Sequence, residues 1–146
     1  MRKGLRRRPR QVGDLPMATQ PWRIVAVFGP IERILHRLDA DGTIDAAQGR
    51  PVFYEDASAG WYESVAAIRG LVHFHELAAE RLNEQADVLG LVRLANKLDT
   101  GAPLFESDLE AARRSIETCK RQALRLTINA ASEMLQTVQI SALAEA

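Results

Sequence analysis

The sequence predicts an all-α protein, a bundle of about four helices with a long C-terminal helix. Apolar residues recur at three- and four-residue spacing through most of the 146-residue chain, and hydrophobic residues make up 47% of it. A chain of this length can bury a substantial core within one domain. We therefore expect one helical domain over residues 21–146, preceded by a disordered basic arm over residues 1–20.

The first helix is expected from about Pro21 to Leu38, because proline suits a first helical turn. Gly29-Pro30 should break or kink it, since proline lacks an amide donor and disfavours helical backbone at the preceding residue. Beyond that point an i, i+3, i+4, i+7 stripe is formed by Ile31, Ile34, Leu35 and Leu38.

Helical periodicity is lost over residues 39–57, which contain Gly42, Gly49 and Pro51. An irregular insert, or a minimal hairpin pairing Thr43-Ile44 with Val52-Phe53-Tyr54, is expected there.

A second helix is expected from about Ser58 to Leu82 and a third from about Asp87 to Leu98. Gly101 should end the third helix in the left-handed conformation. In the core we expect Trp61, Ile68 and Val72 to pack against Ile34, Leu38 and the last helix.

The last helix should begin at a capping box formed by Ser107 and Glu110. It either continues to about Leu143 or breaks at Thr127-Ile128-Asn129, where β-branched residues and an asparagine weaken a helix. Its apolar track is long enough to predict self-association of the chain into a homo-oligomer. The track comprises Leu109, Ala112, Ile116, Cys119, Ala123, Leu126 and Ala130, and then Ala131, Leu135, Val138 and Ala142.

The basic residues are unevenly distributed along the chain. Six of the 19 lie within residues 1–10, whereas all 19 acidic residues follow, so residues 11–146 carry 13 basic and 19 acidic side chains and a formal net charge of −6. Such an arm predicts weak nucleic-acid contact that is independent of sequence, with a solvated arm or a translation start at Met17 as alternatives. The six residues are Arg2, Lys3, Arg6, Arg7, Arg8 and Arg10.

A second candidate nucleic-acid contact lies on the last helix, opposite its apolar track, at Arg114, Arg121 and Arg125. The alternative is a solvated helix face diluted by Glu110 and Glu117.

Two short motifs resemble known sites but fail at defining residues. Asp99-Thr100-Gly101 resembles the aspartic-protease signature, yet it closes a helix in a chain with few strands. Asp39 to Asp45 resembles part of a calcium loop, but Arg37 and Gln48 stand where the first ligand and the bidentate glutamate belong. We therefore expect a protein that is not an enzyme and has no cofactor.

A helical-bundle metal site is the rival prediction. His73, Glu76 and Glu80 share one helical face, and Glu32 and His36 form a second pair four residues apart. Neither helix carries the Glu-x-x-His spacing of di-iron proteins, so solvated polar faces, with His75 near the core, explain the same residues.

A further pattern comprises the arm, Pro21-Trp22-Arg23, the run from Phe28 to Leu35, and Gly49-Arg50-Pro51-Val52-Phe53 with Trp61-Tyr62. It resembles small uncharacterised helical proteins of proteobacteria and their prophages. The resemblance implies no catalytic residues and favours an accessory or regulatory role in a mobile element.

These observations predict a self-associating adaptor or regulatory protein whose arm contacts nucleic acid. The alternatives are a protein-binding module without nucleic acid and the metal-binding bundle. No apolar region follows the basic start, and Ile24 to Phe28 is too short to span a bilayer, so a cytoplasmic location without membrane contact is expected. The protein partner is not identified by the sequence.

Overall fold

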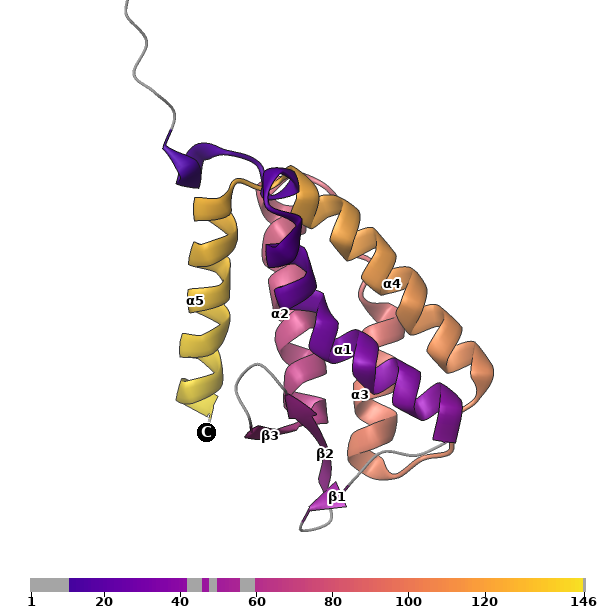
Figure 1. The fold of residues 1–146 in the computed structure, drawn as a ribbon. Helices are drawn as coiled ribbons and strands as arrows, with labels where there is room; N and C mark the ends of the chain where they lie inside the picture. The colour runs from indigo at the N-terminus through magenta and orange to yellow at the C-terminus, as the bar shows by residue number, and fades with distance from the viewer. Residues whose placement is uncertain (1–10, 42–45, 48–49, 56–59, 146) are drawn as a thin grey trace, which may run out of the picture.

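The computed structural model describes residues 11–41, 46–47, 50–55 and 60–145, with side chains over residues 11–40 and 63–139. The predicted all-α class is confirmed, because five helices of the described chain pack together around one core (Figure 1). They are α1 (Pro21–Asp41), α2 (Ser64–Arg81), α3 (Leu89–Thr100), α4 (Glu106–Arg125) and α5 (Ile128–Glu145). Among the described residues, none of these helices is both long and apolar enough to cross a membrane.

The predicted break of α1 at Gly29-Pro30 is wrong, because the helix runs through Pro30 to Asp41, whereas the alternative of a kink stays a prediction. Proline in a helix interior costs about 3 kcal/mol through its missing hydrogen bond and its ring. Burial of the residues on either side, Phe28 and Ile31, supplies a comparable stabilisation of about 1.5–3 kcal/mol for each side chain. Tertiary packing therefore keeps α1 continuous.

A small antiparallel sheet of strand order β1-β2-β3 occupies the predicted insert and extends beyond it. Its strands are β1 (Ala46–Ala47), β2 (Arg50–Glu55) and β3 (Gly60–Glu63). β3 pairs Trp61 with Tyr54 and Tyr62 with Phe53, so the start of α2 predicted at Ser58 is wrong. These aromatic residues favour a pleated strand once β2 is available as a partner. Thr43-Ile44, the expected first strand, lies outside the described residues.

The predicted core residues are buried, and they join the helices as expected. Ile34, Leu38, Ile68 and Val72 belong to one hydrophobic cluster, whereas the side chain of Trp61 lies outside the described part. The apolar track of the last helix is buried from Leu109 to Ala130, so its periodicity correctly identified the inward face.

The last helix breaks at the predicted triplet, because α4 ends at Arg125 and Leu126 has an extended backbone. α5 then turns back along α2 in the same chain (Figure 1). Its inward residues Ala131 and Met134 are buried within the chain, which weakens the argument for self-association through this helix. The oligomeric state stays a prediction.

Residues 11–20 form a strap over the α4–α5 junction, so the predicted disordered arm is wrong for this stretch. Two short 3-10 turns, η2 (Val12–Asp14) and η3 (Met17–Thr19), flank an antiparallel bridge between Pro16 and Thr127. Met17 N donates to Leu126 O at 2.8 Å, and Ile128 N donates to Leu15 O at 3.0 Å. Met17 is also buried in the core, because its side chain is only 2% exposed.

The predicted capping box at Ser107 is also wrong. α4 begins two residues earlier than that cap requires, with Phe105 as its N-cap. The Asp108 carboxylate accepts a hydrogen bond from Phe105 N at 2.8 Å and another from Lys97 Nζ at 2.7 Å. The hydrogen bond from Lys97, followed by that from Phe105, lowers the pKa of Asp108. This contact joins the start of α4 to α3.

Candidate interaction surface

Ion pairs join α1 and α4 along their outer surface, and the order of the paired residues shows that the two helices are antiparallel. Arg113 on α4 pairs with Asp39 at 3.1 Å, and two turns later Lys120 pairs with Glu32. Continuing by one more turn brings Leu124 of α4 level with Phe28 of α1. The end of α4 therefore lies beside the first half of α1, as Figure 1 shows.

Large apolar side chains are exposed at this shared end. Trp22 is 62% exposed and Val25 is 68% exposed, and Leu124 is 36% exposed. The first ten residues of α1 contain a single charged residue, Arg23, so this half of the helix is apolar on its outer face as well as its inner one. A helix that is apolar on all sides normally has partners on all sides. This signal was present in the sequence but was not used to predict a site.

The predicted arginines of α4 lie on its exposed face, and Arg121 and Arg125 are next to this end. Arg125 is paired with Glu84 of the loop after α2, which neutralises its charge locally. Arg121 donates a hydrogen bond to Thr118 Oγ1 at 3.4 Å. Within the described chain, neither Arg114 nor Arg121 forms an ion pair with a carboxylate. Two of the three arginines can therefore contact an external anion without breaking an ion pair.

The remaining predicted nucleic-acid contacts lie outside the described residues. They are Arg2, Lys3, Arg6, Arg7, Arg8 and Arg10.

The residues of the rival metal site are distributed over two surfaces. Glu32 and His36 line a groove of about 330 Å³ between α1 and α4, where Lys120 already pairs with Glu32. Glu80 instead lines a second groove, between α2 and α5. Among the described residues, no group of three histidine, cysteine, aspartate or glutamate side chains is arranged to hold a metal ion.

His75 and Gln122 form a buried polar pair that sequence reasoning identified only in part. His75 was expected near the core with its polar atoms satisfied, but within the described structure neither ring nitrogen has a hydrogen-bond partner. Gln122 lies near the ring and donates instead to Gln85 O at 3.4 Å. Burial lowers the pKa of His75, against smaller opposing effects of Asp87, Gln122 and Glu76. Burial therefore favours the neutral form of the ring in the folded protein.

Cys119, the single cysteine, is fully buried on the inner face of α4. Burial raises the pKa of its thiol to about 12, so the thiolate required of a nucleophile is not formed near neutral pH.

The two motifs that resembled known sites have structural roles. Asp99 pairs with Arg69 at 3.3 Å, and Gly101 ends α3 with φ of 70°, as predicted. Asp39 pairs with Arg113, whereas residues 42–45 of the calcium-like segment lie outside the described chain.

No protein-family model, curated protein or solved structure matches the chain. The resemblance to uncharacterised proteobacterial and prophage proteins therefore stays a prediction.

Proposed function

We propose that this protein is a non-enzymatic adaptor or regulatory accessory protein. Its body pairs with a second copy of itself, and its basic arm contacts nucleic acid without reading sequence. The exposed apolar end of α1, with Trp22 and Val25, carries the first part of this proposal. The charge separation between residues 1–10 and the remainder of the chain carries the second part.

Self-association is assigned to the α1 end because the inward residues of α5 already pack within the chain. Elsewhere in the described body, large exposed apolar residues stand singly. They are Val12 in η2, Leu89 at the start of α3, and Phe105, whose ring centre lies 4.8 Å from Lys97 Nζ. A few residues near the centre of an interface, most often Trp, Tyr or Arg, contribute most of the association free energy, so Trp22 is the residue to test.

Sedimentation velocity at tens of micromolar tests this part. The Trp22→Ser variant should be monomeric at concentrations where the natural chain is dimeric. Leu89→Ser is the matched control, because Leu89 is 58% exposed but lies on another helix, and it should leave the dimer intact. A natural chain that is a strict monomer, or equal loss of dimer in both variants, would contradict the assignment.

Nucleic-acid contact is tested by salt dependence. If the arm neutralises about five phosphates, log K for a duplex falls with log salt at a slope of about −4 to −5. Replacing Arg6, Arg7, Arg8 and Arg10 by Gln should reduce this slope by about 3.6, because each phosphate contact contributes about 0.9. The Arg114→Gln/Arg121→Gln variant should reduce it by at most about 1.8.

A protein-binding module without nucleic acid is the second candidate, and the same exposed α1 end favours it. It would be indicated by a duplex affinity that is undetectable at low salt, together with a dimer that depends on Trp22.

A further inference from the structure

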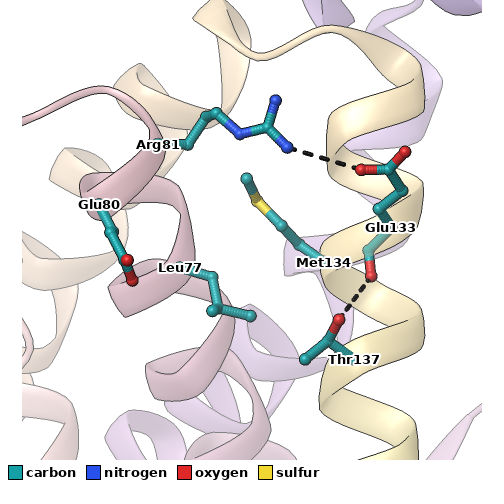
Figure 2. A pocket seen from close by; sticks show the side chains of 6 residues that line it. All are labelled: Leu77, Glu80, Arg81, Glu133, Met134 and Thr137. Carbon is teal, nitrogen blue, oxygen red and sulfur yellow. Dashed lines mark hydrogen bonds and ion pairs between the residues drawn. The ribbon is translucent and has the colours of Figure 1, made fainter.

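The groove between α2 and α5 is lined by side chains of both helices, some apolar and some charged. It has a volume of about 450 Å³, and Figure 2 shows Leu77 and Met134 pointing toward one another between the helices. Glu80 and Glu133 supply carboxylates, and Arg81 crosses the groove to Glu133 at 3.5 Å. An apolar floor with acidic walls suits an arginine-rich segment, whose side chains have aliphatic stems and charged ends.

The ion pair already present in this groove is exchangeable. Both side chains of the Arg81–Glu133 pair are more than half exposed, at 56% and 70%. Exposed pairs of this kind contribute about 0–1 kcal/mol, so another guanidinium can replace Arg81 at little cost. The second carboxylate, Glu80, is exposed and lies in no ion pair within the described chain.

The arm joins the body beside this groove. Gly13 in η2 lies directly against the side chain of Asn129, at the start of α5. Glu133 and Thr137 stand four and eight residues further along that helix, which is about 6 and 12 Å at 1.5 Å per residue. Ten residues span up to about 33–36 Å when extended, so residues 1–10 reach the whole groove.

We propose that the groove between α2 and α5 binds the basic residues of this chain's own N-terminal arm, in competition with nucleic acid. The charges are complementary, because the arm carries six cations and no acid. The competition rests on the proposed nucleic-acid function, whereas docking of the arm does not. Docked arms are withheld from nucleic acid, so the body regulates the affinity of its own arm.

Docking is tested directly with a nitroxide spin label on the full chain carrying Gly4→Cys. Cys119 is buried and its thiol remains protonated, so the reagent labels the introduced cysteine. At low salt, the amide signals of Glu80 and Thr137 should be broadened by the label, and 0.5 M salt should restore them.

The Glu80→Gln/Glu133→Gln variant should abolish this broadening. Glu106→Gln/Glu110→Gln is the matched control. Both residues are exposed near the start of α4, at the end of that helix opposite to the α4–α5 junction, so their substitution should leave the broadening unchanged. Broadening that is unaffected by the groove variant, or that is centred on another surface, would overturn the proposal.

A titration with a duplex separates this inference from the proposed function. We expect the broadening in the groove to disappear as duplex is added. The Glu80→Gln/Glu133→Gln variant should bind the duplex two- to tenfold more tightly than the control, which is the ratio expected for an arm docked from about half to nine-tenths of the time. Broadening that persists at every duplex concentration would retain the docking and refute nucleic-acid binding by the arm. Duplex binding without any groove broadening would refute the docking alone.

Discussion

Two glycines, Gly70 in α2 and Gly90 in α3, lie within helices but differ in what a side chain would meet. A Cβ at Gly90 would lie 2.8 Å from Ala112 N and closer still to the Ala111 carbonyl group, so α3 approaches the backbone of α4 at this point. A Cβ at Gly70 would lie 3.5 Å from Val138 Cγ1, which is ordinary van der Waals contact. The same Gly→Ala change should therefore have opposite effects at the two positions.

Gly90 is the second residue of α3, so helix propensity alone predicts for Gly90→Ala a gain of at most about 1 kcal/mol, the value for a helix interior, in the free energy of unfolding. Overpacking typically costs about 1–3 kcal/mol, and here the obstacle is helix backbone, which cannot rotate away as a side chain can. Using the upper end of that range, we expect the free energy of unfolding to fall by about 2 kcal/mol in total, which corresponds to a melting temperature lower by about 6 °C. Separation of the helices would also loosen the buried Leu91 and Leu94.

Gly70→Ala is the matched control, and it should stabilise the protein by about 0.5–1 kcal/mol. Urea unfolding followed by circular dichroism at 222 nm measures both changes on one scale. If both variants shift the free energy of unfolding in the same direction, the close approach of α3 to α4 does not determine the role of Gly90.

Three further predictions concern titratable groups and the strap. Because the pKa of His75 is lowered in the folded state, the unfolded chain binds more protons than the folded chain. The free energy of unfolding should therefore fall as pH decreases below about 6.5, by at most about 1.4 kcal/mol per pH unit. His75→Gln should reduce this pH dependence, measured by urea unfolding between pH 7 and 5. Asp108→Asn should cost about 1–2 kcal/mol at pH 7, and the difference from the natural chain should shrink below about pH 4, because the lowered pKa of Asp108 stabilises the fold only while the carboxylate is ionised. Removal of residues 1–16 should lower the melting temperature far more than removal of residues 1–10, and equal melting temperatures for the two truncations would refute a structural role of the strap. Met17→Ala should lower the free energy of unfolding by about 2–5 kcal/mol, measured by urea unfolding.

The features that were predicted correctly from the sequence are ones that nearby residues determine. Gly101 ends α3 because glycine, which has no Cβ, adopts a φ of 70° at no steric cost, and a single residue carries that signal. The buried face of α4 follows from apolar spacing, and the exposed positions of Arg114 and Arg121 follow from the same periodicity. Each of these depends on residues within one or two helical turns.

Features that depend on distant residues were not predicted. Trp61-Tyr62 joins a strand because β2 lies beside it, whereas the sequence predicted a helix from about Ser58. Met17 is ordered because its amide and side chain meet the α4–α5 junction more than a hundred residues later. His75 lies near Gln122 only after α2 packs against α4, so no local pattern could reveal that its ring nitrogens lack partners.

The candidate surface shows the same division. The arginines of α4 were predicted because a charged residue on an amphipathic helix has a clear periodic position. Trp22 and Val25 were missed, because no candidate site was predicted from the apolar stretch that contains them. The composition of residues 21–30 contained the necessary signal, since one charged residue in ten leaves the outer face of α1 apolar.

The strap also determines how the arm should be studied. A truncation at Met17 removes the six cations, but it also removes Leu15 O as the acceptor for Ile128 N and the turn that lies against Asn129. A loss of duplex binding in that truncation would combine lost charge with a loosened α4–α5 junction. Changing the arm arginines to Gln within the full chain removes charge but keeps residues 11–20, whose contacts with the α4–α5 junction are those described above. Only the second design assigns a change in salt dependence to the arm.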